Sequence, residues 1–174
     1  MIKKKLTAHF NKNQLVKIIQ EDEKLFKETL HLAINHHKNP IGWRAAWIIN
    51  QVINQNDERI KVHASKIIEV IKEKEDGHQR ELLKIIEKMD FEEKWESKIL
   101  ELTTNIWKQV NKPPSLRIVA WRILLQIAEK YPEIQTEIGF LSEERYLETL
   151  SPGIKSSFYK LTERMINPKP SSLD

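Results

Sequence analysis

The sequence predicts an all-α protein built from stacked helical pairs, and three observations support this fold class. A basic residue recurs at intervals of about 37 residues. A helix-start signal lies shortly before each of these residues, which favours a new helix in every period. Glycine occurs only four times in 174 residues, a composition that suits helices. The basic residues are Arg44, Arg80, Arg117 and Lys155, and the start signals are Asn39-Pro40, Asp76-Gly77, Pro113-Pro114 and Ser151-Pro152. We expect a right-handed α-α superhelix of about four helical pairs with an N-terminal capping helix.

Composition narrows the class of protein further. Hydrophobic residues make up 40% and charged residues 31% of the sequence, and the formal net charge is +4. No run of 18 apolar residues occurs, so we expect no membrane partner, and Lys3-Lys4-Lys5 is not followed by a signal-peptide core. Cysteine is absent, which excludes disulfides, thiolate catalysis and cysteine-based zinc sites and favours a cytoplasmic location. We expect a single domain over residues 1–166.

Residues 1–20 are expected to form the N-terminal cap, with a short helix from Lys12 to Gln20. The first pair begins near Asp22, because Phe26, Leu30 and Ala33 form one stripe of an amphipathic helix. Its second helix is predicted from Pro40 to about Gln55.

The second pair begins at Asp57, where Asn56 or Asp57 can cap free amides. Its first helix is predicted as continuous, and its apolar face consists of Ile60, Ala64, Ile67, Ile68 and Ile71. His63 lies among these residues and is predicted to be partly buried and hydrogen-bonded. The second helix of the pair is predicted from Gly77 to Met89.

The third pair opens at Asp90 with a variant of the capping box, and its second helix follows Lys112-Pro-Pro-Ser115. The fourth pair is less regular: a short helix ends near Leu141, a second segment covers Glu143–Leu150, and the last helix runs from Pro152 to about Ile166. Two prolines in residues 167–174 predict a flexible C-terminal tail.

The segment Pro40-Ile-Gly-Trp-Arg-Ala-Ala46 resembles the second helix of a HEAT repeat, and Ser115-Leu-Arg-Ile-Val-Ala120 is a second, looser match. The resemblance covers about residues 21 to 166. The Trp43–Ile48 segment also resembles small uncharacterised bacterial HEAT-like proteins. This resemblance implies a HEAT/ARM-like fold and no established activity. Glu81-Leu82-Leu83 departs from it, because small residues are usual there.

The recurring basic residues have two interpretations. One basic side chain per repeat would form a row along the stack, and such a row in HEAT-like solenoids usually pairs with acidic groups of neighbouring repeats. Fixed ion pairs are ordinary features of a scaffold, so we prefer this structural interpretation to ligand binding.

Charge is divided between the two rows of helices. Segments predicted as first helices have a net negative charge, and those predicted as second helices have a net positive charge. Second helices line the concave side of a HEAT-type stack, which would make that side electropositive and attractive to an acidic or phosphorylated protein segment. Attraction between the two rows, which would also keep the solenoid soluble, is the slightly preferred explanation, because surface charge alone is weak evidence of a partner. The candidate binding residues are Trp43, Arg44, Trp47, Arg80, Lys112, Arg117, Arg122 and Lys155.

Trp43 and Trp47 lie one turn apart and share a helix face. Core packing is the preferred interpretation, although one of the two could reach the surface and stack on a base, sugar or peptide group. Nucleic-acid binding is therefore the alternative function. A DNA glycosylase of HEAT-like fold is its minority version, since no carboxylate on the predicted second helices lies one turn from a tryptophan.

Motifs for catalysis or cofactor binding are absent from the sequence. The histidines lack the spacing of a metal site, and no P-loop, dinucleotide fingerprint or nucleophile elbow occurs. We therefore predict a non-catalytic protein-binding scaffold with no catalytic residue, metal or small-molecule cofactor.

Overall fold

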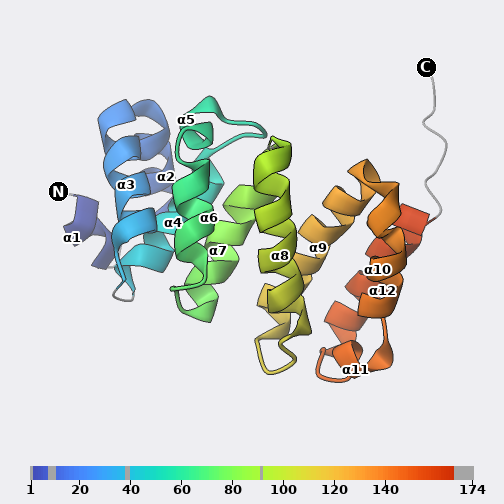
Figure 1. Ribbon diagram of the computed structural model, residues 1–174. Coiled ribbons are helices and arrows are strands. Elements are labelled where there is room, and N and C mark those ends of the chain that lie inside the picture. The colour runs from blue at the N-terminus through green and yellow to red at the C-terminus, as the bar shows by residue number, and fades with distance from the viewer. Residues whose placement is uncertain (1, 8–10, 38–39, 91, 167–174) are drawn as a thin grey trace, which may run out of the picture. The chain divides into compact units, whose positions relative to one another are not determined.

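The computed structural model describes residues 2–7, 11–37, 40–90 and 92–166 (Figure 1). Within these residues the chain forms twelve α-helices and one 3-10 helix without any strand, so the all-α prediction is confirmed. The chain divides into two compact units, Met1–Trp95 and Glu96–Asp174. A single domain over residues 1–166 stays a prediction. The tail expected over 167–174 lies outside the described residues.

The first unit begins with two short helices, α1 (Ile2–Thr7) and α2 (Lys12–Glu21). The Asn11 side chain accepts a hydrogen bond from the Gln14 amide at 3.3 Å, which caps α2. Both helices contact α3 and α4, and Ile2 and Leu6 of α1 are fully buried against the fold. The cap thus contains α2 as predicted and one further helix, α1, that the sequence analysis did not predict.

The first pair consists of α3 (Glu23–Asn35) and α4 (Ile41–Val52), whose ribbons run side by side in Figure 1. Asp22 caps α3 by accepting a hydrogen bond from the Leu25 amide at 3.0 Å. The predicted stripe of Phe26, Leu30 and Ala33 is buried, as are Ala45 and Ala46 on the facing side of α4. These small residues permit close packing of the two backbones.

The first helix of the second pair differs from the prediction, because it is split into α5 (Glu58–Lys61) and α6 (Ala64–Ile71). At the split, the His63 amide donates to the Ile60 carbonyl, three residues back instead of four. All five predicted apolar residues are still buried. The tighter turn rotates His63 out of their face and exposes it, so the prediction of a partly buried His63 is wrong.

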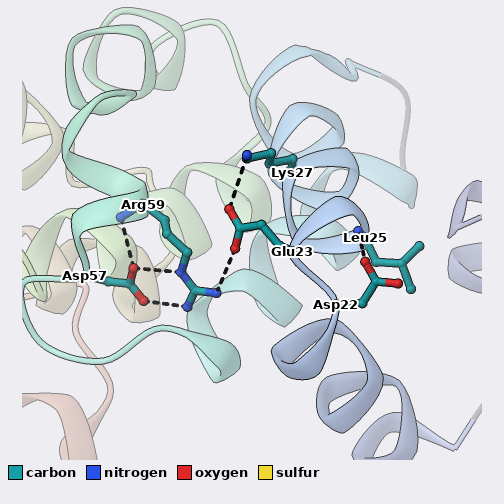
Figure 2. Close-up of polar contacts among 6 residues, drawn as sticks. All are labelled: Asp22, Glu23, Leu25, Lys27, Asp57 and Arg59. Atoms are coloured by element: carbon teal, nitrogen blue, oxygen red, sulfur yellow. Dashed lines mark hydrogen bonds and ion pairs between the residues drawn. The ribbon is translucent and has the colours of Figure 1, made fainter.

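Arg59 links the first helices of the two pairs (Figure 2). Its guanidinium donates to Asp57 at 2.9 and 2.7 Å, reaches Glu23 at 3.9 Å and lies 3.8 Å from the centroid of the Phe26 ring. Hydrogen bonding to Arg59 lowers the pKa of Asp57 below its usual value. Asp57 also caps α5 through the Arg59 amide, as the sequence predicts.

The second helix of this pair, α7 (Asp76–Glu87), packs against α4. Leu82, Leu83 and Ile86 are buried as predicted. The two helices come close at Gly42, where an added Cβ would lie 2.5 Å from the His36 carbonyl oxygen and 2.6 Å from Cε1 of His78. Gly42 is therefore required by the packing of α4 on its neighbours.

The second unit contains most of α8 (Glu93–Lys108), followed by α9 (Pro114–Lys130) and a broken segment that ends in α12 (Pro152–Ile166). The broken segment comprises η1 (Pro132–Ile134), α10 (Gln135–Leu141) and α11 (Glu144–Leu147). This irregular first half of the fourth pair agrees with the prediction, as does the last helix.

Three aromatic rings form the centre of the second unit. Trp107 from α8, Trp121 from α9 and Phe158 from α12 are essentially fully buried, with ring centroids 4.6 to 5.5 Å apart. The Trp107 indole donates to the Leu141 carbonyl at 2.8 Å, and the Trp121 indole donates to the Thr162 hydroxyl at 3.1 Å. Burial of these large side chains supplies much of the driving force for folding this unit.

Gly42→Ala tests the close contact of α4. Alanine normally stabilises a helix interior by about 1 kcal/mol relative to glycine. At Gly42 the new methyl group would overlap a carbonyl and an imidazole, so we expect a net destabilisation of about 1–3 kcal/mol. Urea unfolding measures the difference. Gly139→Ala in α10 is the matched control, because nothing lies within 4 Å of its added Cβ. Equal gains in both variants would contradict the packing described for α4.

Candidate binding surface

Arg44 stands on α4 and reaches back to the end of α1. Its Nη1 donates to the Leu6 carbonyl at 2.6 Å, and its guanidinium lies 5.8 Å from the centroid of the Trp43 ring. Carbonyls in the last turn of a helix have no partner within that helix. Arg44 therefore satisfies one such carbonyl of α1, and its side chain is half-buried.

Arg80 occupies the equivalent position on α7, but its partner is an acid on the same helix. Arg80 Nε donates to Glu81 Oε1 at 3.0 Å, and Lys84 Nζ lies 3.2 Å from the same oxygen. Glu81 is fully buried, whereas the two cations are each about one-third exposed. A buried carboxylate needs such partners, so these two cations permit a glutamate at position 81, where a small residue is usual in HEAT repeats.

Arg117 on α9 lies in the interior of the second unit, at 0% exposure. It donates to the Trp107 carbonyl at 2.9 Å, to the Thr149 hydroxyl at 3.0 Å and to the Tyr146 carbonyl. Its guanidinium also lies 4.7 Å from the centroid of the Trp107 ring. Burial lowers the pKa of this group below its usual value. These contacts give Arg117 a structural role, because its donors point at groups of its own chain.

Lys155 completes the recurring series with an ion pair to Glu144, at 3.3 Å. All four recurring basic residues thus have partners within the chain, in agreement with the structural interpretation of the series. The partners differ from the acids of neighbouring repeats that the sequence suggests. Arg44 and Arg117 bind backbone carbonyls, because helix ends leave strong acceptors unpaired where these side chains reach.

Lys112 and Arg122 are half-buried, and each takes part in a polar or ring contact within the protein. Lys112 lies just before α9, and Arg122 lies in the middle of that helix. Both retain partly exposed cationic side chains in the second unit.

Both tryptophans of α4 are half-buried, so both reach the surface in part. The Lys12 ammonium of α2 lies 5.5 Å from the centroid of the Trp47 ring, which places α2 beside the indole. Trp107 and Trp121, in contrast, are core residues of the second unit. Trp43, Arg44 and Trp47 thus lie on α4 and Arg80 lies on α7, and these two helices pack against each other.

A buried histidine was missed by the sequence analysis. His78 on α7 is 3% exposed, and its Nε2 lies 2.8 Å from the Ala33 carbonyl at the end of α3. Burial lowers the His78 pKa to about 4, and the nearby charges of Lys74, His37 and His36 act in the same direction. The signal for this contact was present, since Gly42 and His78 stand two residues before Arg44 and Arg80. A missing side chain in one repeat makes room for a large one in the next.

The described residues also bear on two other kinds of site. No group of three or more histidine, cysteine, aspartate or glutamate side chains there could hold a metal ion. No helix in the same residues is long and apolar enough to cross a membrane.

The low pKa of His78 predicts a pH-dependent stability. Because its folded-state pKa lies below the usual 6.5, folding favours the neutral imidazole. This contribution is complete above pH 6.5 and is lost as the pH falls through 6.5 towards about 4. The loss should reach about 3 kcal/mol. Urea unfolding across this range should show a shallower pH dependence for His78→Gln than for the wild type, and His31→Gln, on the exposed side of α3, should leave the dependence unchanged. Parallel curves for the wild type and His78→Gln would contradict the assignment.

Comparison with known proteins places this geometry in a family. A family model described as a HEAT repeat domain matches residues 2–165, almost the whole described chain. No curated protein and no solved structure matches the sequence significantly. Stacked helical pairs and a family match of this extent agree with the resemblance at Pro40–Ala46. The chain belongs to the HEAT repeat domain family.

Proposed function

We propose that this protein is a non-catalytic scaffold that binds an acidic or phosphorylated segment of another protein through the second helices of its pairs. HEAT repeats in general act as protein-interaction scaffolds, because stacked repeats leave an extended surface for recognition. The observation that supports the finer proposal is that partly exposed indoles and cations lie on α4 and α7, two helices that pack against each other.

The proposed contact residues fall into one set for each unit. The first unit offers Trp43, Arg44, Trp47 and Arg80. In the second unit we assign Lys112, Arg122 and Lys155 to contact with the partner. Arg117 is fully buried, so we propose that it supports this surface from within and does not contact the partner.

Internal bonds do not prevent these cations from binding a partner. A guanidinium has five donors, and Arg44 uses one of them on the Leu6 carbonyl. Side chains held in place by one bond lose less conformational entropy when they bind an acid. Aromatic side chains beside them add apolar contact area, as is common in protein interfaces.

Second helices line the concave side in HEAT-type stacks. We propose that this side is electropositive and is the face that binds the partner. The proposal requires no metal or small-molecule cofactor. The cytoplasmic location expected from the lack of cysteine is part of the same proposal.

Arg122→Gln combined with Lys155→Gln tests the proposal in the second unit. Binding of a fluorescent oligoglutamate peptide and of a doubly phosphorylated peptide is measured by anisotropy at low salt. We expect the double variant to weaken binding roughly three- to tenfold, because each partly exposed charge pair contributes up to about 1 kcal/mol. Circular dichroism should show an unchanged fold.

Lys98→Gln combined with Lys108→Gln is the matched control. It removes the same charge from the exposed side of α8, a first helix of the same unit. Equal losses in the two double variants would show a nonspecific effect of net charge. Equal losses, or no binding of either peptide to the wild type, would overturn the proposal.

A further inference from the structure

The N-terminal cap is a region of purely positive side-chain charge. Residues 1–20 contain five lysines and no aspartate or glutamate, and the first acid of the chain is Glu21. Lys3, Lys4 and Lys5 lie on α1, and Lys12 and Lys17 lie on α2. All five lysines are exposed.

Contacts connect the two helices that carry these lysines to the tryptophan-bearing helix α4. Lys12 lies 5.5 Å from the Trp47 ring, and Trp43 lies one helical turn before Trp47. Arg44 lies 5.8 Å from the Trp43 ring and donates to the carbonyl of Leu6, the residue after Lys5. The Lys12 ammonium of α2 therefore lies beside the Trp47 indole, and Arg44 connects the Trp43 end of α4 to the C-terminal end of α1, the helix that carries Lys3, Lys4 and Lys5. We name Lys3, Lys4, Lys5, Lys12, Trp43, Arg44 and Trp47 the lysine–indole surface.

Burial within the cap argues against a lipid membrane as the partner. Helices that bind membranes insert an exposed apolar face between lipids. Here four apolar residues of the cap helices are buried, since Ile2 is 1%, Leu6 0%, Leu15 3% and Ile19 0% exposed, and Val16 and Ile18 are partly buried. Among the described residues of the cap, the exposed side chains are lysines and polar residues, so α1 and α2 present no exposed large apolar side chain for insertion.

The combination of lysines and indoles matches single-stranded nucleic acid. Lysines contact a phosphate backbone as point charges, and indole rings stack on bases that are not paired. In a duplex the bases stack on one another and their faces are unavailable to a protein ring. We propose that the lysine–indole surface binds single-stranded nucleic acid, with the cap lysines on phosphates and with Trp43 and Trp47 on bases.

This proposal goes beyond the protein-binding function and does not depend on it. The two surfaces share Trp43, Arg44 and Trp47, but the cap lysines belong to the lysine–indole surface alone. The second-unit residues Arg122 and Lys155 belong only to the proposed protein-binding surface.

The first experiment measures binding of a fluorescent oligothymidylate of about fifteen nucleotides by anisotropy, in KCl from about 50 to 200 mM. Affinity should fall with salt, because each phosphate contact releases counterions. The combined variant Lys3→Gln, Lys4→Gln and Lys5→Gln should weaken binding at least tenfold at low salt. It should also make the salt slope shallower by about 0.7 per lysine, about two in total.

Lys27→Gln combined with Lys66→Gln and Lys72→Gln is the matched control. These lysines are exposed on or next to the first helices of the same unit, and their removal changes the net charge equally. The control should keep the wild-type salt slope and an affinity close to that of the wild type. The Arg122→Gln and Lys155→Gln variant should also bind oligothymidylate as the wild type does, which separates this test from that of the protein-binding function.

A second experiment tests the indoles without altering the protein. An abasic oligomer of the same length has the same phosphates but no bases, so it should bind the wild type at least tenfold more weakly at equal salt slope. Trp47→Leu should lower the affinity for oligothymidylate by a similar factor and leave that for the abasic oligomer unchanged. A duplex of the same length should bind more weakly than the single strand.

Several results would overturn the proposal. These are no binding of oligothymidylate at about 50 mM KCl, equal binding of the abasic oligomer, or equal losses in the two triple variants. Tighter binding of the duplex would exclude stacking on the indoles. Binding to phosphatidylserine vesicles that the cap variant abolishes, without binding to oligothymidylate, would assign the cap to a membrane surface instead.

Discussion

Carbonyls at the C-terminal ends of helices impose the constraint on which this structure most depends. Each helix leaves its last carbonyls without a partner, and a stack of short helices buries many such ends. In this structure, side chains from other parts of the chain donate hydrogen bonds to several of these carbonyls. The pairs are Arg44 with Leu6, His78 with Ala33, Lys88 with Asn50 and Ile53, Arg117 with Trp107 and Tyr146, and the Trp107 indole with Leu141. Cations are favoured at these ends because the helix dipole is negative there.

This constraint explains two of the four recurring basic residues, Arg44 and Arg117, whereas Arg80 and Lys155 pair with acids. A long cationic side chain can reach the end of a neighbouring helix, and its hydrogen bond to a carbonyl is stronger than one from a neutral donor. Where the site is closed, as at Arg117, the side chain is fully buried and donates to two carbonyls of other helices. Where it is open, as at Arg44, part of the side chain remains at the surface. A scaffold and a binding surface can thus use the same residues.

Local periodicity predicted most helices, because a buried stripe is a property of one helix alone. The apolar face of Ile60 to Ile71 was correct even though the helix that carries it is split. The split itself, helix α1 and the carbonyl partners of Arg44 and Arg117 were not predicted. They depend on contacts between residues distant in sequence, which a pattern within one helix does not encode. The sequence predicted the residue types of the candidate binding surface. It did not predict which cations are buried and which are exposed, because that depends on where neighbouring helices end.

Comparing Arg117→Met with Lys155→Met tests this account most directly, since both residues hold the same position in their repeats. Arg117→Met leaves two buried carbonyls without a charged donor, so the free energy of unfolding should fall by about 3 kcal/mol or more. Lys155→Met breaks a partly exposed ion pair and should cost less than about 1 kcal/mol. Urea unfolding followed by tryptophan fluorescence measures both values. Similar small losses in the two variants would contradict the claim that capping of helix ends holds the repeats together.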